Sequence, residues 1–173
     1  MRQNGYTRLM EQFDRVDAKI AHWMARNGIA YVRVSLGIVF LWFGALKLVP
    51  GLSPAEELAG STIQALTFGL VQPSVAMPIL GVWECLIGIG LLSGRFLRTT
   101  LMLMALQMIG TVTPIVLFPG ELFMRAPFVP TIVGQYVIKN VVLVSAAIVI
   151  GATVRGGKLR SEPTGEFARH VAA

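Results

Sequence analysis

Four long apolar runs alternate with short polar segments along the chain. A helix of about 20 residues, rising about 1.5 Å per residue, spans the roughly 30 Å hydrocarbon layer of a bilayer. Each run reaches that length. The pattern therefore predicts an all-α, polytopic membrane protein, a bundle of four transmembrane helices within a domain of residues 29–154, with spans at about 29–49, 73–92, 101–118 and 131–154.

The segments that flank this domain have a different pattern. Between residues 7 and 27, apolar residues recur at spacings of three and four, and charged residues fill the other positions. This pattern is typical of an amphipathic helix in the headgroup plane, so residues 1–28 are predicted to form an N-terminal interfacial helix; a solvated leader is the alternative. Residues 155–173, rich in Gly, Lys and Arg, are predicted to be a flexible basic tail.

Two connections between the spans also carry information. Residues 55–72 contain an apolar run too short to span a bilayer, which indicates a short interfacial or re-entrant helix. Residues 119–130 contain three prolines, so we expect an ordered loop that is not helical throughout.

Composition agrees with a membrane protein. Hydrophobic residues make up 54% of the chain and charged residues 14%, too apolar for an ordinary soluble domain. The 15 Lys and Arg exceed the 9 Asp and Glu, but the basic residues lie between apolar runs, which indicates membrane orientation and not nucleic-acid binding. A single cysteine excludes an intramolecular disulfide, and both histidines lie outside the spans, so no covalently attached or metal-held cofactor is predicted.

The basic residues also predict the orientation. Five lie in the N-terminal segment, two in the connection between the second and third spans, and four in the tail, whereas the connections on the opposite side contain only Arg125. By the positive-inside rule, both termini are predicted to be cytoplasmic.

Several ionisable side chains lie inside the predicted spans. In the first span, Arg33 and Lys47 share one helix face with Gly37, Phe40 and Gly44. A cation in lipid costs from about 2.5 to more than 10 kcal/mol, so this face should look toward protein or water.

Glu84, in the second span, is the single acid against the cations Arg33, Lys47 and Lys139. Counting helix rise from the predicted span ends brings Glu84 within reach of Arg33 or Lys139 and leaves Lys47 near the outer boundary, where it can extend to the surface. Glu84 is then either an ion-pair acceptor that holds two helices together or part of a polar pocket for a ligand or a proton. The predicted intramembrane polar network consists of Arg33, Lys47, Glu84, Gln107, Gln135 and Lys139.

Three segments resemble a known family: RVSLGIVFLWFGALK at residues 33–47, GVWE at 81–84 and GQYVIKN at 134–140. They are similar to the DoxX-like superfamily of small four-helix membrane proteins, most of all to its YkgB/RclC-type branch. The resemblance implies a bacterial inner-membrane location and a role in redox or oxidative-stress physiology, and some relatives are the membrane subunit of a thiosulfate:quinone oxidoreductase. The chain departs from the branch at Gln135 and Asn140, where branch members often carry Arg and Asp.

Three functions fit these observations. The first is a partner-dependent membrane subunit that binds a quinone or a similar lipophilic molecule, in a cavity open toward the outer leaflet. The second is a structural or accessory subunit without a ligand, and the third is a transporter of a small solute. The sequence has no internal inverted repeat, which weighs against transport, and no complete catalytic motif, which leaves enzymatic activity open. The expected cavity is bordered by Lys47, Glu84, Gln107, Gln135 and Lys139.

The orientation is testable by cysteine labelling in a Cys85→Ala background. A single cysteine at position 57 or 121 should react with a membrane-impermeant maleimide added from outside, because both positions lie on the side with few basic residues. Labelling of either position only from the cytoplasmic side would reverse the topology.

Overall fold

A computed structural model describes residues 3–54, 56–157 and 159, and the predicted flexible tail lies largely outside the described residues. The chain divides into two compact units, Met1–Arg95 and Phe96–Ala173. Each unit is described by itself.

The first unit begins with α1, Gln3–Lys47, a single helix of 45 residues. The helix predicted over residues 7–27 is confirmed, but the boundary expected near residue 28 is wrong, because the helix continues into the first span without interruption. Gly28 costs a helix interior only about 1 kcal/mol, and no proline lies nearby. The Asn27 side-chain amide donates to the Trp23 carbonyl one turn earlier, at 2.9 Å.

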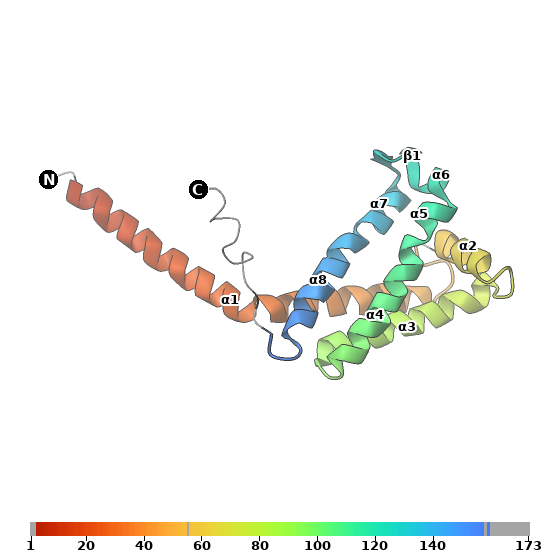
Figure 1. Ribbon diagram of the computed structural model, residues 1–173, viewed down its shortest axis with the longest axis horizontal. Helices are drawn as coiled ribbons and strands as arrows, with labels where there is room; N and C mark the ends of the chain where they lie inside the picture. Colours follow the sequence, from red (N-terminus) through yellow and green to blue (C-terminus); the bar gives the residue numbers. More distant parts are fainter. Residues whose placement is uncertain (1–2, 55, 158, 160–173) are drawn as a thin grey trace, which may run out of the picture. The chain divides into compact units, whose positions relative to one another are not determined.

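The second long helix of this unit is α3, Pro73–Ser93, which runs antiparallel to α1 along the C-terminal half of α1 (Figure 1). Glycines bring the two backbones together. A Cβ at Gly88 would lie 2.6 Å from the Leu41 nitrogen, and one at Gly44 would lie 2.9 Å from the Gly81 carbonyl oxygen. The face predicted for the first span, with Gly37 and Gly44, is therefore confirmed as a contact with protein.

Between them lies α2, Glu56–Leu66, which packs on α3. The Glu56 carboxylate accepts a hydrogen bond from the Gly51 nitrogen at 2.8 Å, which closes the turn after α1. A Cβ at Gly60 would lie 3.0 Å from Pro73 Cβ, so α2 contacts the start of α3. The short helix predicted in this connection is confirmed.

In the second unit, the third span consists of α4, Leu97–Val112, and α5, Pro114–Leu117. Thr113, between them, keeps helical backbone angles, φ −53° and ψ −38°, and its hydroxyl donates to the Ile109 carbonyl at 3.0 Å. Pro114 lacks an N–H and therefore interrupts the hydrogen-bond ladder without unwinding the helix.

The fourth span consists of α7, Ile132–Ile138, and α8, Asn140–Thr153. Lys139, between them, is also helical, with φ −58° and ψ −21°. The Val142 nitrogen donates to the Lys139 carbonyl three residues earlier, at 2.9 Å. The helix is tightened at this point and does not break.

The third and fourth spans are joined by an ordered loop, as predicted. It contains the short helix α6, Pro119–Leu122, and an antiparallel pair of strands, β1, Phe123–Arg125, and β2, Val129–Pro130. Thr131 then caps α7, because its hydroxyl accepts from the Gly134 nitrogen at 3.0 Å and donates to the Glu121 carbonyl at 2.8 Å.

The described residues contain four helical stretches long and apolar enough to cross a membrane. The all-α class, the four spans and the bilayer environment are therefore confirmed. The stretches are Phe13–Lys47, Pro73–Ser93, Leu97–Leu117 and Ile132–Thr153.

The close approach of α1 and α3 predicts a sensitive glycine. Replacement of Gly88 by Ala should lower the unfolding midpoint in detergent, because the methyl group meets the Leu41 backbone and overpacking costs about 1–3 kcal/mol. Gly110→Ala is the matched control: a Cβ there has no atom within 4 Å, so the midpoint should stay or rise. Equal midpoints for the two variants would contradict the proposed packing.

Candidate functional site

The residues of the predicted polar network fall into both units. Arg33, Lys47 and Glu84 belong to the first unit, and Gln107, Gln135 and Lys139 belong to the second. Of the three network residues in the first unit, two, Lys47 and Glu84, are in contact.

Lys47 and Glu84 form an ion pair between α1 and α3. The Lys47 Nζ lies 2.6 Å from the Glu84 Oε2, and the two side chains are only 10% and 9% exposed. The ammonium also donates to the Phe43 carbonyl one turn earlier, at 3.4 Å. A charge-assisted hydrogen bond of this length, shielded from solvent, is strong because the surrounding dielectric constant is low.

The geometry of antiparallel helices explains why these two side chains meet. Side chains on a helix lean toward its N-terminus, so Lys47 leans back along α1 and Glu84 leans back along α3. Since the helices run in opposite directions, the two side chains lean toward each other. Gly44 and Gly81 lie in the same contact and leave the space that the ion pair needs.

Within the first unit, Glu84 pairs with Lys47, which the depth count had placed near the outer boundary, and not with Arg33, so that expectation was wrong. The alternative partner Lys139 belongs to the second unit, and its pairing with Glu84 stays a prediction. Lys47 lies against Gly81, eight residues after Pro73 and therefore about 12 Å along α3 from its start. Counting depth from the predicted span ends places the end of α1 and the start of α3 at the same depth in the membrane. In the structure, the N-terminal part of α3 extends past the end of α1.

Arg33 contacts the opposite end of α3. Its guanidinium donates to the Leu91 carbonyl and, at 3.2 Å, to the Leu92 carbonyl. These are last-turn carbonyls, where the helix dipole favours a cation. Gly94 ends the helix in the left-handed region, φ +68°, and a Cβ there would lie 2.8 Å from the guanidinium. Leu91 lies seven residues beyond Glu84, about 10 Å along the helix, so Arg33 stabilises a helix end.

The three residues of the second unit have different surroundings. Gln107 is buried on α4, whereas Gln135 and Lys139 are largely exposed. The Lys139 Nζ lies 4.0 Å from the centroid of the Tyr136 ring, a cation–π contact. The expected cavity draws on residues of both units and stays a prediction.

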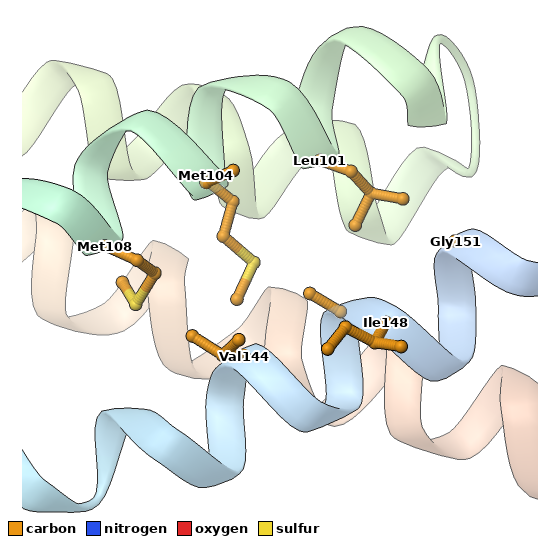
Figure 2. Close-up of a pocket in the computed structure, with 8 residues that line it drawn as sticks. Leu101, Met104, Met108, Val144, Ile148 and Gly151 are labelled. Carbon is orange, nitrogen blue, oxygen red and sulfur yellow. The ribbon is translucent and has the colours of Figure 1, made fainter.

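A groove of about 240 Å³ lies between α4 and α8 within the second unit. Figure 2 shows side chains from both helices pointing toward it, among them Met104 and Met108 from α4 and Val144 and Ile148 from α8. The groove is not predictable from the sequence, because apolar residues on a membrane helix look like ordinary lipid-facing or packing residues. Two methionines on one face of α4 were the available signal, since Met fills irregular space.

Among the residues that the structure describes, no three His, Cys, Asp or Glu side chains lie close enough together to bind a metal ion. The chemistry that the first unit offers is therefore that of an ammonium and a carboxylate in an apolar environment. The second unit offers, by itself, a lipophilic groove.

The ion pair predicts non-additive stability effects. Lys47→Met and Glu84→Met should each destabilise the fold by about 3–5 kcal/mol, because each leaves one buried charge without its partner. The double variant should recover most of this loss, since two apolar side chains replace both charges. The measurement is the unfolding transition of all four proteins in detergent. Additive losses would mean that the two charges do not interact.

Comparison with known proteins places the chain in a family. The sequence model of the DoxX family matches residues 28–118, just over half of the chain, and this range includes Arg33, Lys47, Glu84 and Gln107. No curated protein and no solved structure matches the chain. With four membrane-spanning helices and a family match of this extent, the chain belongs to the DoxX family.

Proposed function

We propose that this DoxX-family membrane protein is a partner-dependent subunit that binds a quinone or a similar lipophilic carbonyl compound and acts in redox or oxidative-stress physiology. The proposal includes kinship with the YkgB/RclC-type branch and a place in the bacterial inner membrane, with both termini in the cytoplasm.

The observation that carries this proposal is the buried pair of Lys47 and Glu84. A buried ion pair adds little net stability, because desolvation of both charges offsets their attraction, and well-packed apolar residues often serve a fold equally well. Ionisable groups within a membrane are therefore functional candidates. An ammonium that donates a hydrogen bond to a ligand carbonyl, next to a carboxylate that accepts from a hydroxyl, suits the head group of a quinone or its reduced form.

Two further features support a ligand of this class. The spans predicted at residues 29–49, 73–92, 101–118 and 131–154 contain three cations and one acid, an imbalance that favours a carbonyl-bearing or anionic head group over a cationic one. Within the second unit, taken by itself, the groove between α4 and α8 has an apolar lining of the kind that lipophilic molecules occupy.

Electron transfer in this proposal requires a partner protein. The chain has one cysteine, and His22 and His170 lie outside the spans predicted at residues 29–49, 73–92, 101–118 and 131–154, so these spans supply no haem-ligand pair or thiolate cluster. The bound quinone would exchange electrons with a cofactor of that partner, while this chain binds and orients the head group.

A second candidate is an accessory subunit without a ligand. The close glycine contacts around Lys47 and Glu84, and the direct bond between the two side chains, favour this alternative, because the pair then serves to hold α1 against α3. Transport has less support, since the spans remain helical at Thr113 and Lys139, whereas transporter sites typically use unwound helices.

Quinone binding separates the first two candidates. A short-tailed benzoquinone should quench the tryptophan fluorescence of the purified protein, since Trp83 neighbours Glu84 in sequence. The Lys47→Met/Glu84→Met double variant, which is expected to fold, should bind at least about tenfold more weakly, which corresponds to about 1.4 kcal/mol, the size of one lost hydrogen bond. Lys139→Ala tests the second unit in the same assay, and Gly110→Ala is the control that should bind normally.

Absence of saturable binding by the wild type, or equal affinity of all four proteins, would contradict the proposal and favour the accessory subunit. Weaker binding by Lys139→Ala alone would place the head group at Tyr136 and Lys139 and not at the ion pair.

A further inference from the structure

The N-terminal part of α1 extends beyond the end of its helical partner α3 (Figure 1). Arg33 is level with the last turn of α3, as its hydrogen bonds show. Residues 10–32 therefore extend about 33 Å past that level along the helix axis. This projecting segment is longer than the contact with α3 requires.

One face of the projecting segment is apolar and exposed. Phe13, Val16, Ile20 and Trp23 are each at least 50% exposed and lie three, four and three residues apart. Asn27 follows four residues later. We call these five residues the N-terminal seam. Alternation of three and four is the heptad spacing of a coiled coil, with Phe13, Ile20 and Asn27 at the a positions.

We propose that the N-terminal seam is the interface with a second copy of this chain, and that the two α1 helices form a parallel two-stranded coiled coil. In sequence, Tyr6 and Leu9 continue the same spacing, so the repeat covers three heptads from position 6 to position 26. Asn27 at an a position suits this arrangement, because a buried Asn there pairs with its copy across the axis and fixes the register of a dimer.

Because α1 is one continuous helix, the N-terminal seam cannot lie flat on the membrane surface and be covered by lipid headgroups. From Asn27 to Phe13 the helix rises about 21 Å, and even a tilt of 40° leaves about 16 Å along the bilayer normal. The headgroup region is only about 5–8 Å thick on each side, so Phe13 and Val16 project into water. An apolar seam in water is stable only when another protein surface covers it.

The charges of this segment also favour a second copy of the chain over the membrane surface. The repeat, residues 6–26, contains three acids, Glu11, Asp14 and Asp17, against four bases, Arg8, Arg15, Lys19 and Arg26. Helices that bind the membrane surface are typically rich in Lys and Arg, whereas this nearly balanced segment has little attraction to anionic lipid and little repulsion from its own copy.

The shared membrane fixes the geometry of the dimer. Both copies cross the bilayer in the same direction, so their projecting helices must be parallel, related by a twofold axis along the membrane normal. The a and d residues of each helix then face the same positions of the other, and a cysteine at a d position approaches its copy closely.

Cysteine cross-linking of the full-length protein in lipid vesicles tests the dimer. In a Cys85→Ala background, Val16→Cys should form an intermolecular disulfide on mild oxidation, and the yield should persist when the protein is diluted into excess lipid. Ala18→Cys, on the opposite side of the helix, should give at least about tenfold less. Both positions are exposed in one chain, so neither substitution should disturb the fold.

A charge at the seam provides the second measurement. Ile20→Lys should abolish the Val16→Cys cross-link, and the neighbouring Ala21→Lys, which adds the same charge outside the seam, should leave it unchanged. Equal cross-linking at positions 16 and 18, none at position 16, or a spin label at position 16 that reports burial among lipid headgroups would each overturn the coiled-coil proposal.

Discussion

The contact between α1 and α3 is the constraint on which the first unit depends. In a bilayer, lipid tails are as apolar as the helix surfaces, so helices associate through close packing and polar contacts and not through exclusion of water. Glycines at 44, 81 and 88 let two backbones approach to distances that no side chain would permit. The same approach shields the ion pair between Lys47 and Glu84 from lipid. Packing and electrostatics here support each other, since the charges need an enclosed site and the glycines provide one.

Arg33 and Lys47, the two cations of α1 within the predicted first span, show how position determines role. Both lie on the face that packs against α3, fourteen residues apart. Lys47 meets a carboxylate in the middle of α3, whereas Arg33 meets carbonyl groups at its end. The first contact combines two ionisable side chains in an apolar environment. The second satisfies backbone acceptors that every helix end leaves open, which gives Arg33 a structural role and leaves Lys47 and Glu84 as the better candidates for chemistry.

Helical periodicity predicted most of the residues that face each other between α1 and α3, because the face on which a residue lies depends only on its spacing along the helix. The face that contains Gly37, Gly44 and Lys47, and the glycines on either side of Glu84, were visible in the sequence. The partner of Glu84 was not, because it depends on how far α3 continues past α1, and the length of apolar runs does not reveal relative depth. The continuous helix through Gly28 was missed for a different reason: a glycine and a change of composition look like a boundary, yet their cost is small within 45 helical residues. The groove between α4 and α8 depends on packing gaps, which residue types alone do not specify.

The ligand site and the dimer interface that we propose lie in different parts of the chain relative to the family match. The matched range, residues 28–118, contains the ion pair of Lys47 and Glu84, so a ligand bound there belongs to the part of the chain that defines the family. All five residues of the N-terminal seam precede this range, and Lys139 follows it. Dimerisation through the seam is then a property added to the family's membrane domain. A dimer would hold two copies of the ion-pair site in one assembly, and its loss should leave the contact between α1 and α3 unchanged, because the seam and the α3-facing residues occupy different stretches of α1.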